Sequence, residues 1–330
     1  MIPVRRFNPG SDQIGVICPS DSIKAFPRRR ARAVANLEKL TSSKLVFARH
    51  AMGALGKASG SARNRTQDLE EMLVDPSIGM IMAATGGYST VDVVDQLDID
   101  LVRAHAKPII GFSDVTMLLN HIYERTGCIT FHGPALLPNF GSAEPPIWQG
   151  EVTLSTMAKP TAGMYVKDPQ FACDSFQFWD QDDDNVSPQK PVIARKSIGR
   201  KPVEGPLIGG NLDTLVAMAA ARMLPESKGA LIFIEAAFGF VEKAARDLKV
   251  LELGGFFNQA NGLIVGIPFQ IVGGERLQTI VEDLASSKGL SLLSGLSIGH
   301  TSPITIMPIG ATARLDPEAG TLMLIEDVTR

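Results

Sequence analysis

The chain has 330 residues, of which 45% are hydrophobic and 20% charged, and its formal net charge is -3. This length suits two domains of ordinary size or one large domain, and we expect two. The small negative charge argues against a non-specific nucleic-acid binder, and no apolar run approaches the roughly eighteen residues needed to cross a bilayer.

The start of the chain, MIPVRRFNPGSDQ, has two arginines but no apolar segment behind them, so we expect no secretory signal there. The three cysteines, Cys18, Cys128 and Cys173, lie far apart and lack metal-ligand spacing. Such cysteines are typical of a reducing compartment. We therefore predict a cytoplasmic protein without disulfides or a membrane partner.

The first 140 residues alternate short apolar runs with helical patterns. The apolar runs are continuous rather than alternating, which is typical of a parallel sheet covered by helices on both faces. We predict an α/β fold with a doubly wound, mainly parallel sheet in the N-terminal domain. The expected strands are 14–18, 44–48, 78–84, 108–112 and 128–133, and the expected helices are 26–40, 62–75, 89–97 and 114–125.

Residues 141 to 203 contain prolines, acids and aromatics without sustained periodicity, which indicates a linker and an irregular excursion. Beyond them the sequence predicts a smaller, mixed α/β C-terminal domain. Its expected strands are 229–237 and 262–268, and its expected helices are 241–253 and 276–287. The predicted division of the chain is 1–145, 146–200 and 201–330.

The acids of the excursion, Asp180, Asp182, Asp183 and Asp184, have no histidine nearby. They suit a solvated loop better than a metal site. We therefore predict no metal centre.

Two loops follow predicted strands at the edge of the sheet where α/β proteins bind ligands. The first contains Thr85, Gly86, Gly87 and Tyr88. Paired glycines let the backbone approach a ligand closely and present free N–H groups, although such a pair more often forms only a turn. No complete G-x-G-x-x-G or P-loop lysine accompanies it, which argues against a nucleotide cofactor.

The second loop contains Gly111, Ser113 and Asp114 between a predicted strand and a predicted helix. On its own, Ser113 is best interpreted as a helix N-cap. The alternative is a nucleophile elbow, in which a tight turn exposes the serine and free N–H groups stabilise an oxyanion. Val115 stands where the G-x-S-x-G pattern has its second glycine, so the α/β-hydrolase signature is absent.

A serine nucleophile needs a base that is itself held by a third group. Of the five histidines, His300 follows Gly299 in a loop from which it could reach a cleft. Its position alone leaves catalytic and structural roles equally open. Glu235 ends a strongly apolar strand, where a carboxylate needs a partner or water, or else points to solvent.

These stretches together resemble the LD-carboxypeptidase family of serine peptidases, which includes the microcin C self-immunity peptidases. The resemblance runs in order along nearly the whole chain: IGVICPSD, RNRTQDLEEMLVDPSIGMIMAATGGYST, KPIIGFSDVT, TFHGP, EGPLIGGNLDTL, LIFIE and GHTSPITIMPIGATARLD. It implies an α/β N-terminal domain with a smaller C-terminal domain, catalysis through an acyl-enzyme, and no cofactor.

Carried over to this sequence, the family's Ser-Glu-His triad corresponds to three residues. The resemblance implies that Ser113 is the nucleophile, His300 the general base and Glu235 the group that orients the base. The order Ser, Glu, His along the chain is acceptable because geometry rather than sequence position defines a triad.

The resemblance also implies an oxyanion hole and substrate contacts. The oxyanion donors would be the backbone N–H groups of Gly87 and Asp114. Gly86, Tyr88 and Trp179 would contact the substrate, with Trp179 stacking on it.

Two features resemble the microcin C branch: the uncharged Thr85, where many murein-type members have arginine, and the aromatic excursion around Trp179. The missing asparagine in GGYS and the missing acid after Glu235 argue against that branch. The predicted function is a serine-type carboxypeptidase or amide hydrolase, acting as a homodimer on peptidyl- or aminoacyl-nucleotide-like amides. The alternatives are a murein tetrapeptide LD-carboxypeptidase that releases terminal D-Ala and a non-catalytic α/β ligand-binding protein.

Overall fold

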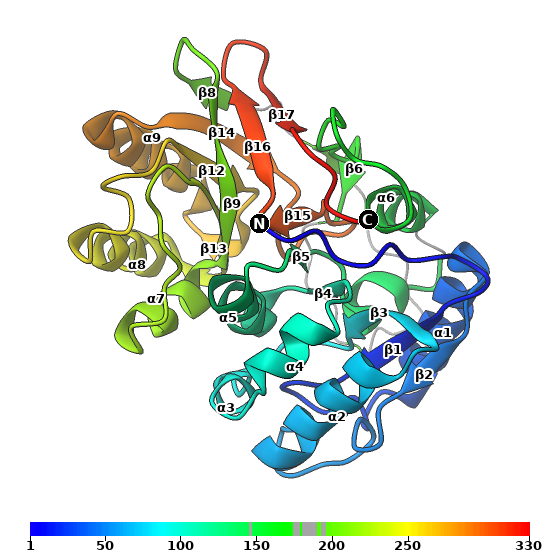
Figure 1. Ribbon diagram of the computed structural model, residues 1–330. Coiled ribbons are helices and arrows are strands. Elements are labelled where there is room, and N and C mark those ends of the chain that lie inside the picture. The colour runs from blue at the N-terminus through cyan, green and yellow to red at the C-terminus, as the bar shows by residue number, and fades with distance from the viewer. Residues whose placement is uncertain (145–146, 174–178, 180–189, 193–195) are drawn as a thin grey trace.

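The computed structural model describes residues 1–144, 147–173, 179, 190–192 and 196–330. These residues form two large sheets with their helices, and the last residues of the chain lie beside residues 4–6 near the start (Figure 1). The acidic run from Asp180 to Asp184 lies outside the described residues. In the part of the chain described, no helix is long and apolar enough to span a membrane.

The first sheet confirms the prediction of a mainly parallel N-terminal sheet. Its strand order is β15-β5-β4-β3-β1-β2, and of these described strands only β15 runs antiparallel to its neighbour. Strands that helices cover on both faces of a sheet are apolar at every position, which is why continuous apolar runs predict them. All six residues of β3 are buried, as this predicts. The strands are β1 Gln13–Ile17, β2 Leu45–Phe47, β3 Ile78–Ala83, β4 Ile109–Gly111, β5 Thr130–His132 and β15 Met307–Ile309.

The helices of this half cover both faces of the sheet. The chain passes from β1 outward to β2 and then back past β1 to β3, so right-handed crossovers place α1 and α2 on opposite faces. Pro27 begins α1, where its missing N–H costs no helical hydrogen bond. Gly127 ends α5 with φ of +74°, a left-handed conformation that glycine adopts readily. The elements are α1 Pro27–Thr41, α2 Ala62–Val74, α3 Val91–Val94, α4 Ile99–Ala104, η1 Ser113–Val115, α5 Thr116–Thr126 and η2 Leu136–Phe140.

The second sheet is mixed, as the sequence predicts for the C-terminal part. Its order is β17-β16-β9-β10-β12-β14-β8, with β9, β10, β12 and β14 parallel and the other strands antiparallel to their neighbours. The strands are β8 Lys196–Ile198, β9 Val203–Asn211, β10 Leu231–Glu235, β12 Gly262–Gly266, β14 Ser291–Leu296, β16 Thr312–Asp316 and β17 Thr321–Leu324.

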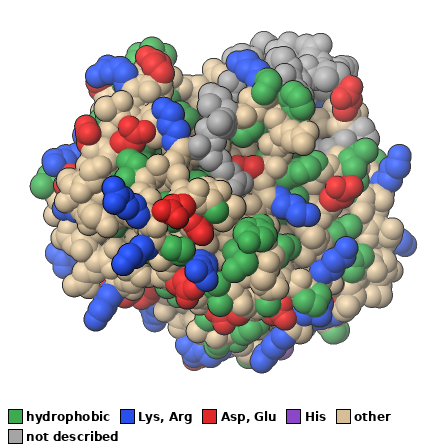
Figure 2. Space-filling model, turned by 90° about the horizontal axis from the view of Figure 1, so that it is seen from above, with side chains coloured by type: hydrophobic (Ala, Val, Ile, Leu, Met, Phe, Trp, Pro, Cys, Tyr) green, Lys and Arg blue, Asp and Glu red, His purple; other side chains and the backbone are tan. Residues whose placement is uncertain are grey.

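Helices and two small sheets complete this half. The helical elements are α7 Leu212–Ala220, α8 Val241–Leu253, η3 Gly274–Arg276 and α9 Leu277–Lys288. The small sheets pair β11 Ala237–Phe240 with β13 Phe269–Val272, and β6 Phe171–Ala172 with β7 Lys190–Pro191. On the face shown in Figure 2, side chains of both charge signs are interspersed, in keeping with the small net charge.

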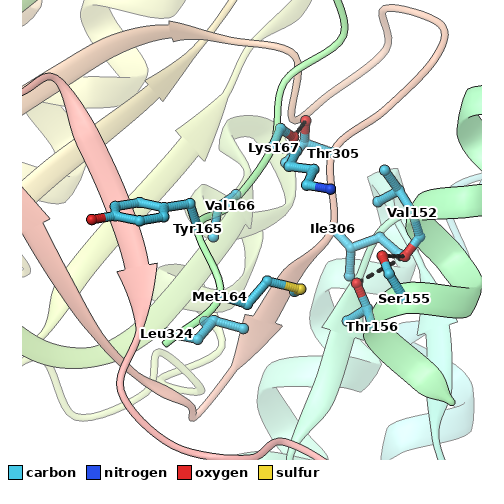
Figure 3. A pocket seen from close by; sticks show the side chains of 10 residues that line it. All are labelled: Val152, Ser155, Thr156, Met164, Tyr165, Val166, Lys167, Thr305, Ile306 and Leu324. Carbon is cyan, nitrogen blue, oxygen red and sulfur yellow. Dashed lines mark hydrogen bonds between the residues drawn. The ribbon is translucent and has the colours of Figure 1, made fainter. Parts of the chain in front are cut away.

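Residues 147–157, where the sequence predicted irregular structure, form α6 Ile147–Met157. The helix was missed because polar Gln149 and Thr153 lie on its buried face together with Val152. Figure 3 shows α6 facing the segment 164–167 and the chain that leads into β15, around a pocket of about 10 Å³. This packing ties the chain beyond α6 to the C-terminal region.

The C-terminal segment returns to the first sheet. β15 pairs with β5, and the terminal strand-like segments meet where Val4 accepts a hydrogen bond from the Arg330 N–H at 2.9 Å. The division into 1–145, 146–200 and 201–330 stays a prediction, and it leaves β15 with the C-terminal part of the chain.

Candidate active site

A cleft lies where the carboxyl ends of strands from both sheets meet. Its volume is about 320 Å³. The loops after β3 and β4 supply one wall, and the ends of β9 and β10 with the loop after β14 supply the other. The lining residues are Gly87, Tyr88, Val91, Ser113, Asp114, Met117, Asn211, Asp213, Thr214, Ala217, Ala221, Ala237, Phe238 and His300.

Ser113 lines this cleft from a strained turn. Its φ is +61°, in the left-handed region that residues other than glycine rarely adopt and that often marks a functional turn. Among the residues that the structure describes, no side chain makes a cap hydrogen bond at the start of η1 or α5. Ser113 is therefore not the N-cap that its local sequence favoured, and its backbone has the sharp turn of an elbow.

The paired glycines bring the neighbouring loop against Ser113. A β-carbon on Gly86 would lie 2.9 Å from the Ser113 Cβ, and one on Gly87 would lie 2.3 Å from the Ser20 Oγ. Gly87 also has φ of +150°. The loop fits between the serine and the β1 loop only because neither position carries a side chain.

Gly87 and Asp114 line the cleft together with Ser113, and each carries a backbone N–H. In the described part of the chain, neither N–H donates a hydrogen bond to another protein group. These are the two groups that the sequence resemblance assigned to the oxyanion hole, and both remain available to a ligand oxygen.

His300 and Glu235 form a hydrogen-bonded pair at the opposite wall. The His300 Nδ1 lies 3.0 Å from the Glu235 Oε2, and the Glu235 side chain is fully buried. Burial raises the pKa of Glu235, but the charge and hydrogen bond of His300, the charge of His132 and the hydrogen bond from Asn211 together outweigh it, so the net pKa is lowered. The carboxyl is thus ionised at neutral pH and holds the Nδ1 side of the imidazole.

Asn211 was not assigned a role by the sequence reasoning. Its Nδ2 donates to the Glu235 Oε1 at 2.8 Å, and its Oδ1 accepts the Thr214 N–H at 3.1 Å as the N-cap of α7. An asparagine just before a helical pattern signals a cap. Nothing in the sequence indicates that the other end of the same amide holds a buried carboxylate.

Aromatic rings surround His300. The ring centroids of Phe112, Phe238 and Phe269 lie 5.0, 5.3 and 5.9 Å from that of the imidazole. No hydrogen bond joins Ser113 to His300 among the described residues. Catalytic hydrogen bonds commonly tighten only when substrate binds, so both side chains in one cleft remain compatible with proton transfer.

The remaining residues predicted to contact substrate lie in different surroundings. Tyr88 is 86% exposed at the rim of the cleft. Trp179 does not line the cleft; its ring packs edge-on against Phe26 at 5.2 Å, and the Arg29 Cζ lies 4.9 Å from its centroid. Stacking of Trp179 on a substrate therefore stays a prediction.

The other histidines lie outside this pair. The His132 ring is fully buried and its Nε2 donates to the Ile298 carbonyl at 2.7 Å, which holds the loop before His300. The His50 Nδ1 lies 2.8 Å from the Asp68 Oδ1, in the N-terminal half of the chain. Within the described ranges, no group of three or more His, Cys, Asp or Glu side chains could hold a metal ion.

Comparison with known proteins relates both halves of the chain to one family. Residues 14–133 match the model of the LD-carboxypeptidase N-terminal domain, and residues 204–315 match that of the LD-carboxypeptidase C-terminal domain. The Microcin C7 self-immunity protein MccF of Escherichia coli is 31% identical over 266 residues, covering 78% of this chain and 77% of that protein. The murein tetrapeptide carboxypeptidase of Pseudomonas aeruginosa is 25% identical over 277 residues, covering 81% and 82%.

Solved structures agree with the sequence comparison. MccF in complex with glutamyl sulfamoyl guanosine, and MccF in complex with aspartyl sulfamoyl adenosine, each match this structure with a TM-score of 0.93 at 27% identity. Each match covers 100% of both chains. The two-domain α/β fold is therefore shared with MccF over its whole length.

Proposed function

This chain belongs to the LD-carboxypeptidase family, and we propose that it is a serine hydrolase with Ser113, His300 and Glu235 as its triad. The observation that carries the proposal is the His300 Nδ1 to Glu235 Oε2 hydrogen bond of 3.0 Å in a cleft that Ser113 also lines. A base held by a buried carboxylate beside a serine is the arrangement that activates a hydroxyl.

In the acylation step, the Ser113 Oγ attacks the carbonyl carbon of the substrate amide as His300 accepts the hydroxyl proton. The N–H groups of Gly87 and Asp114 donate to the oxyanion that forms. His300 then gives the proton to the leaving nitrogen as the carbon–nitrogen bond breaks, which leaves an ester on Ser113. Oxyanion donors act most strongly where water is excluded, and three phenylalanine rings surround the imidazole here.

In the deacylation step, His300 removes a proton from water, whose oxygen attacks the ester. The ester bond breaks, the proton returns to the Ser113 Oγ, and the product is a carboxylic acid. Glu235 stays ionised throughout and stabilises the imidazolium that forms twice in the cycle.

We propose a peptidyl- or aminoacyl-nucleotide-like amide as the substrate. Two solved MccF structures hold an aminoacyl sulfamoyl nucleoside, and this chain matches both over its full length. Thr85 adds no positive charge before the Gly-Gly turn. The second candidate is a murein tetrapeptide, which is favoured by the similarity to the Pseudomonas aeruginosa murein tetrapeptide carboxypeptidase.

The test is incubation of the purified protein with an aminoacyl-adenylate analogue and with murein tetrapeptide, side by side, followed by mass spectrometry. We expect Ser113→Ala to reduce kcat by at least about 10⁴-fold with either substrate, because no other group replaces the nucleophile. Ser155→Ala on α6 is the matched control and should keep wild-type activity, since among the described residues its hydroxyl donates only to the Val152 carbonyl. Undiminished turnover by Ser113→Ala would remove the triad assignment.

A serine-directed fluorophosphonate separates an enzyme from a binding protein with the same cleft. We expect labelling at Ser113 that is lost in His300→Ala, because an unactivated serine reacts poorly. Absence of labelling in the folded wild-type protein would favour the non-catalytic alternative.

We also propose that the protein acts as a homodimer in the cytoplasm. The dimer is what the family resemblance implies, and the cytoplasmic location is what the cysteine pattern of the sequence indicates.

A further inference from the structure

One oxygen of the Asp114 side chain accepts three hydrogen bonds from described residues. The Asp114 Oδ2 accepts the Ser20 hydroxyl at 2.7 Å, the Thr90 N–H at 2.9 Å and the Thr90 hydroxyl at 2.7 Å. Asp114 as a whole residue is 8% exposed, and Ser20 and Thr90 are fully buried. Hydrogen bonds to an ionised acceptor are about twice as strong as neutral ones, so this is a firm connection.

These bonds join three segments that are far apart in the sequence. Ser20 follows β1, and Asp114 follows the nucleophile Ser113 after β4. Thr90 is the last residue of the loop 84–90, which joins β3 to α3, carries Gly86 and Gly87, and is called the Gly-Gly loop below. Ser20 also links Asp114 to Ser89 of this loop, because the Ser20 Oγ accepts the Ser89 N–H at 3.0 Å. The Asp21 N–H also donates to the Gly86 carbonyl at 3.1 Å. The Gly-Gly loop is therefore held at both ends.

The position of this loop decides where one oxyanion donor lies. Gly87 lies between Gly86, whose Cα faces Ser113, and Ser89, which is bonded to Ser20. Gly87 has no side chain to anchor it, so within the described part of the chain the hydrogen bonds that flank it at Gly86 and Ser89 hold its N–H in place. Asp114 thus offers its backbone N–H to the oxyanion directly and fixes the other donor through its carboxylate.

We propose that the Asp114 carboxylate is a positioning group that sets the spacing between the two oxyanion donors of this enzyme. The inference rests on the proposed function, since it assigns a role within that oxyanion hole. Loosening the connection leaves the backbone N–H of residue 114 in place but lets the Gly87 N–H drift, which weakens transition-state binding more than substrate binding.

The test compares Asp114→Asn with a matched pair at Thr90. Asn keeps the shape of Asp but loses the charge that strengthens three bonds, and we expect kcat to fall about 10- to 100-fold with KM within about threefold. Thr90→Val removes only the hydroxyl donor and should lower kcat about 3- to 10-fold. Thr90→Ser restores that donor and should return kcat to within about twofold of wild type. Asp95→Asn, an exposed acid of the same segment, is the control.

Hydrogen exchange gives a readout that does not depend on activity. In Asp114→Asn we expect the Ser89 and Thr90 amides to exchange at least about tenfold faster, with core strands such as β3 unchanged. Either wild-type kcat or wild-type exchange at Ser89 and Thr90 in Asp114→Asn would overturn the proposal. The proposal would also be overturned if exchange became faster throughout the molecule and kcat fell only as much as the fraction of folded protein. Asp114 would then have a merely structural role.

The two proposals fail in distinguishable ways. If Ser113→Ala were as active as wild type, the proposed function would fall, and unchanged exchange at Ser89 and Thr90 would separately reject the connection. If Ser113→Ala were inactive while Asp114→Asn and Thr90→Val kept wild-type kcat, the triad would stand and the positioning role of Asp114 would be lost.

Discussion

The buried negative charge of Glu235 acts on the imidazole of His300. The Glu235 Oε2 meets the Nδ1 side of the imidazole, and the Glu235 Oε1 is held by Asn211. A glutamine at this position keeps the size but can present an amide N–H to the Nδ1, which favours the wrong tautomer of the base. We expect Glu235→Gln to lower kcat about 10³- to 10⁴-fold with KM changed little, measured by steady-state kinetics on the substrate that the wild type cleaves.

The same variant has a characteristic pH dependence of stability. Because the pKa of Glu235 is lowered in the folded protein, its ionised form stabilises the fold above the ordinary value of 4.5, and that stability is lost as the pH falls below 4.5 toward the lower folded value. Glu235→Gln lacks this contribution. Its free energy of unfolding in urea should therefore fall less between pH 5 and pH 3 than that of the wild type. Equal losses in both proteins would contradict the lowered pKa.

At the scale of elements, the close approach of β9 to α5 sets the distance between the two walls of the cleft. A β-carbon on Gly210 would lie 2.5 Å from the Thr116 side chain, and Gly210 has φ of +142°. Next to it, the Asn211 N–H donates to the Thr116 Oγ1 at 3.0 Å. Thr116 begins the helix behind Ser113 and Asn211 holds Glu235, so this contact joins the nucleophile's helix to the triad acid.

We expect Gly210→Ala to lower the free energy of unfolding by more than about 2 kcal/mol, because backbone strain adds to the clash with Thr116. It should also lower kcat, since β9 must move away from α5. Gly163→Ala is the control: Gly163 has φ of +78° but open space around it, so only the backbone cost of about 1–2 kcal/mol applies. Denaturant unfolding of both variants measures the difference. Equal destabilisation would show that the Thr116 contact is unimportant.

The elements differ in how far the sequence could predict them, for physical reasons. β3 and α8 follow from local patterns, a continuous apolar run and a helical repeat, and the predicted helix 241–253 coincides with α8. The φ of +61° at Ser113 did not follow, because tertiary packing rather than local preference imposes it. His300 and Glu235 could be paired only through the family resemblance, since a contact across 65 residues leaves no local pattern.

At the scale of the whole molecule, the first sheet depends on the far end of the chain. β15 forms its edge beside β5, and the pairing joins Met307 to His132. The Phe7 N–H donates to the Met157 carbonyl, and Val4 pairs with the last residues. Strand pairing over such separations has no sequence signal, which is why the predicted division of the chain placed residues 307–309 with the C-terminal part.

These contacts predict the behaviour of a fragment of residues 1–145. Such a fragment would leave the β5 edge unpaired and would expose apolar side chains that are now fully buried, including Phe7 and Phe131. We expect it to lack a cooperative thermal transition by circular dichroism and a dispersed NMR spectrum, and we expect the full chain to show both. A cooperative, dispersed fragment would mean that 1–145 folds alone and that β15 only docks on a finished sheet. Failure to fold would mean that the sheet carrying Ser113 forms together with the half carrying Glu235 and His300, so that the cleft is assembled in the same cooperative step as the fold.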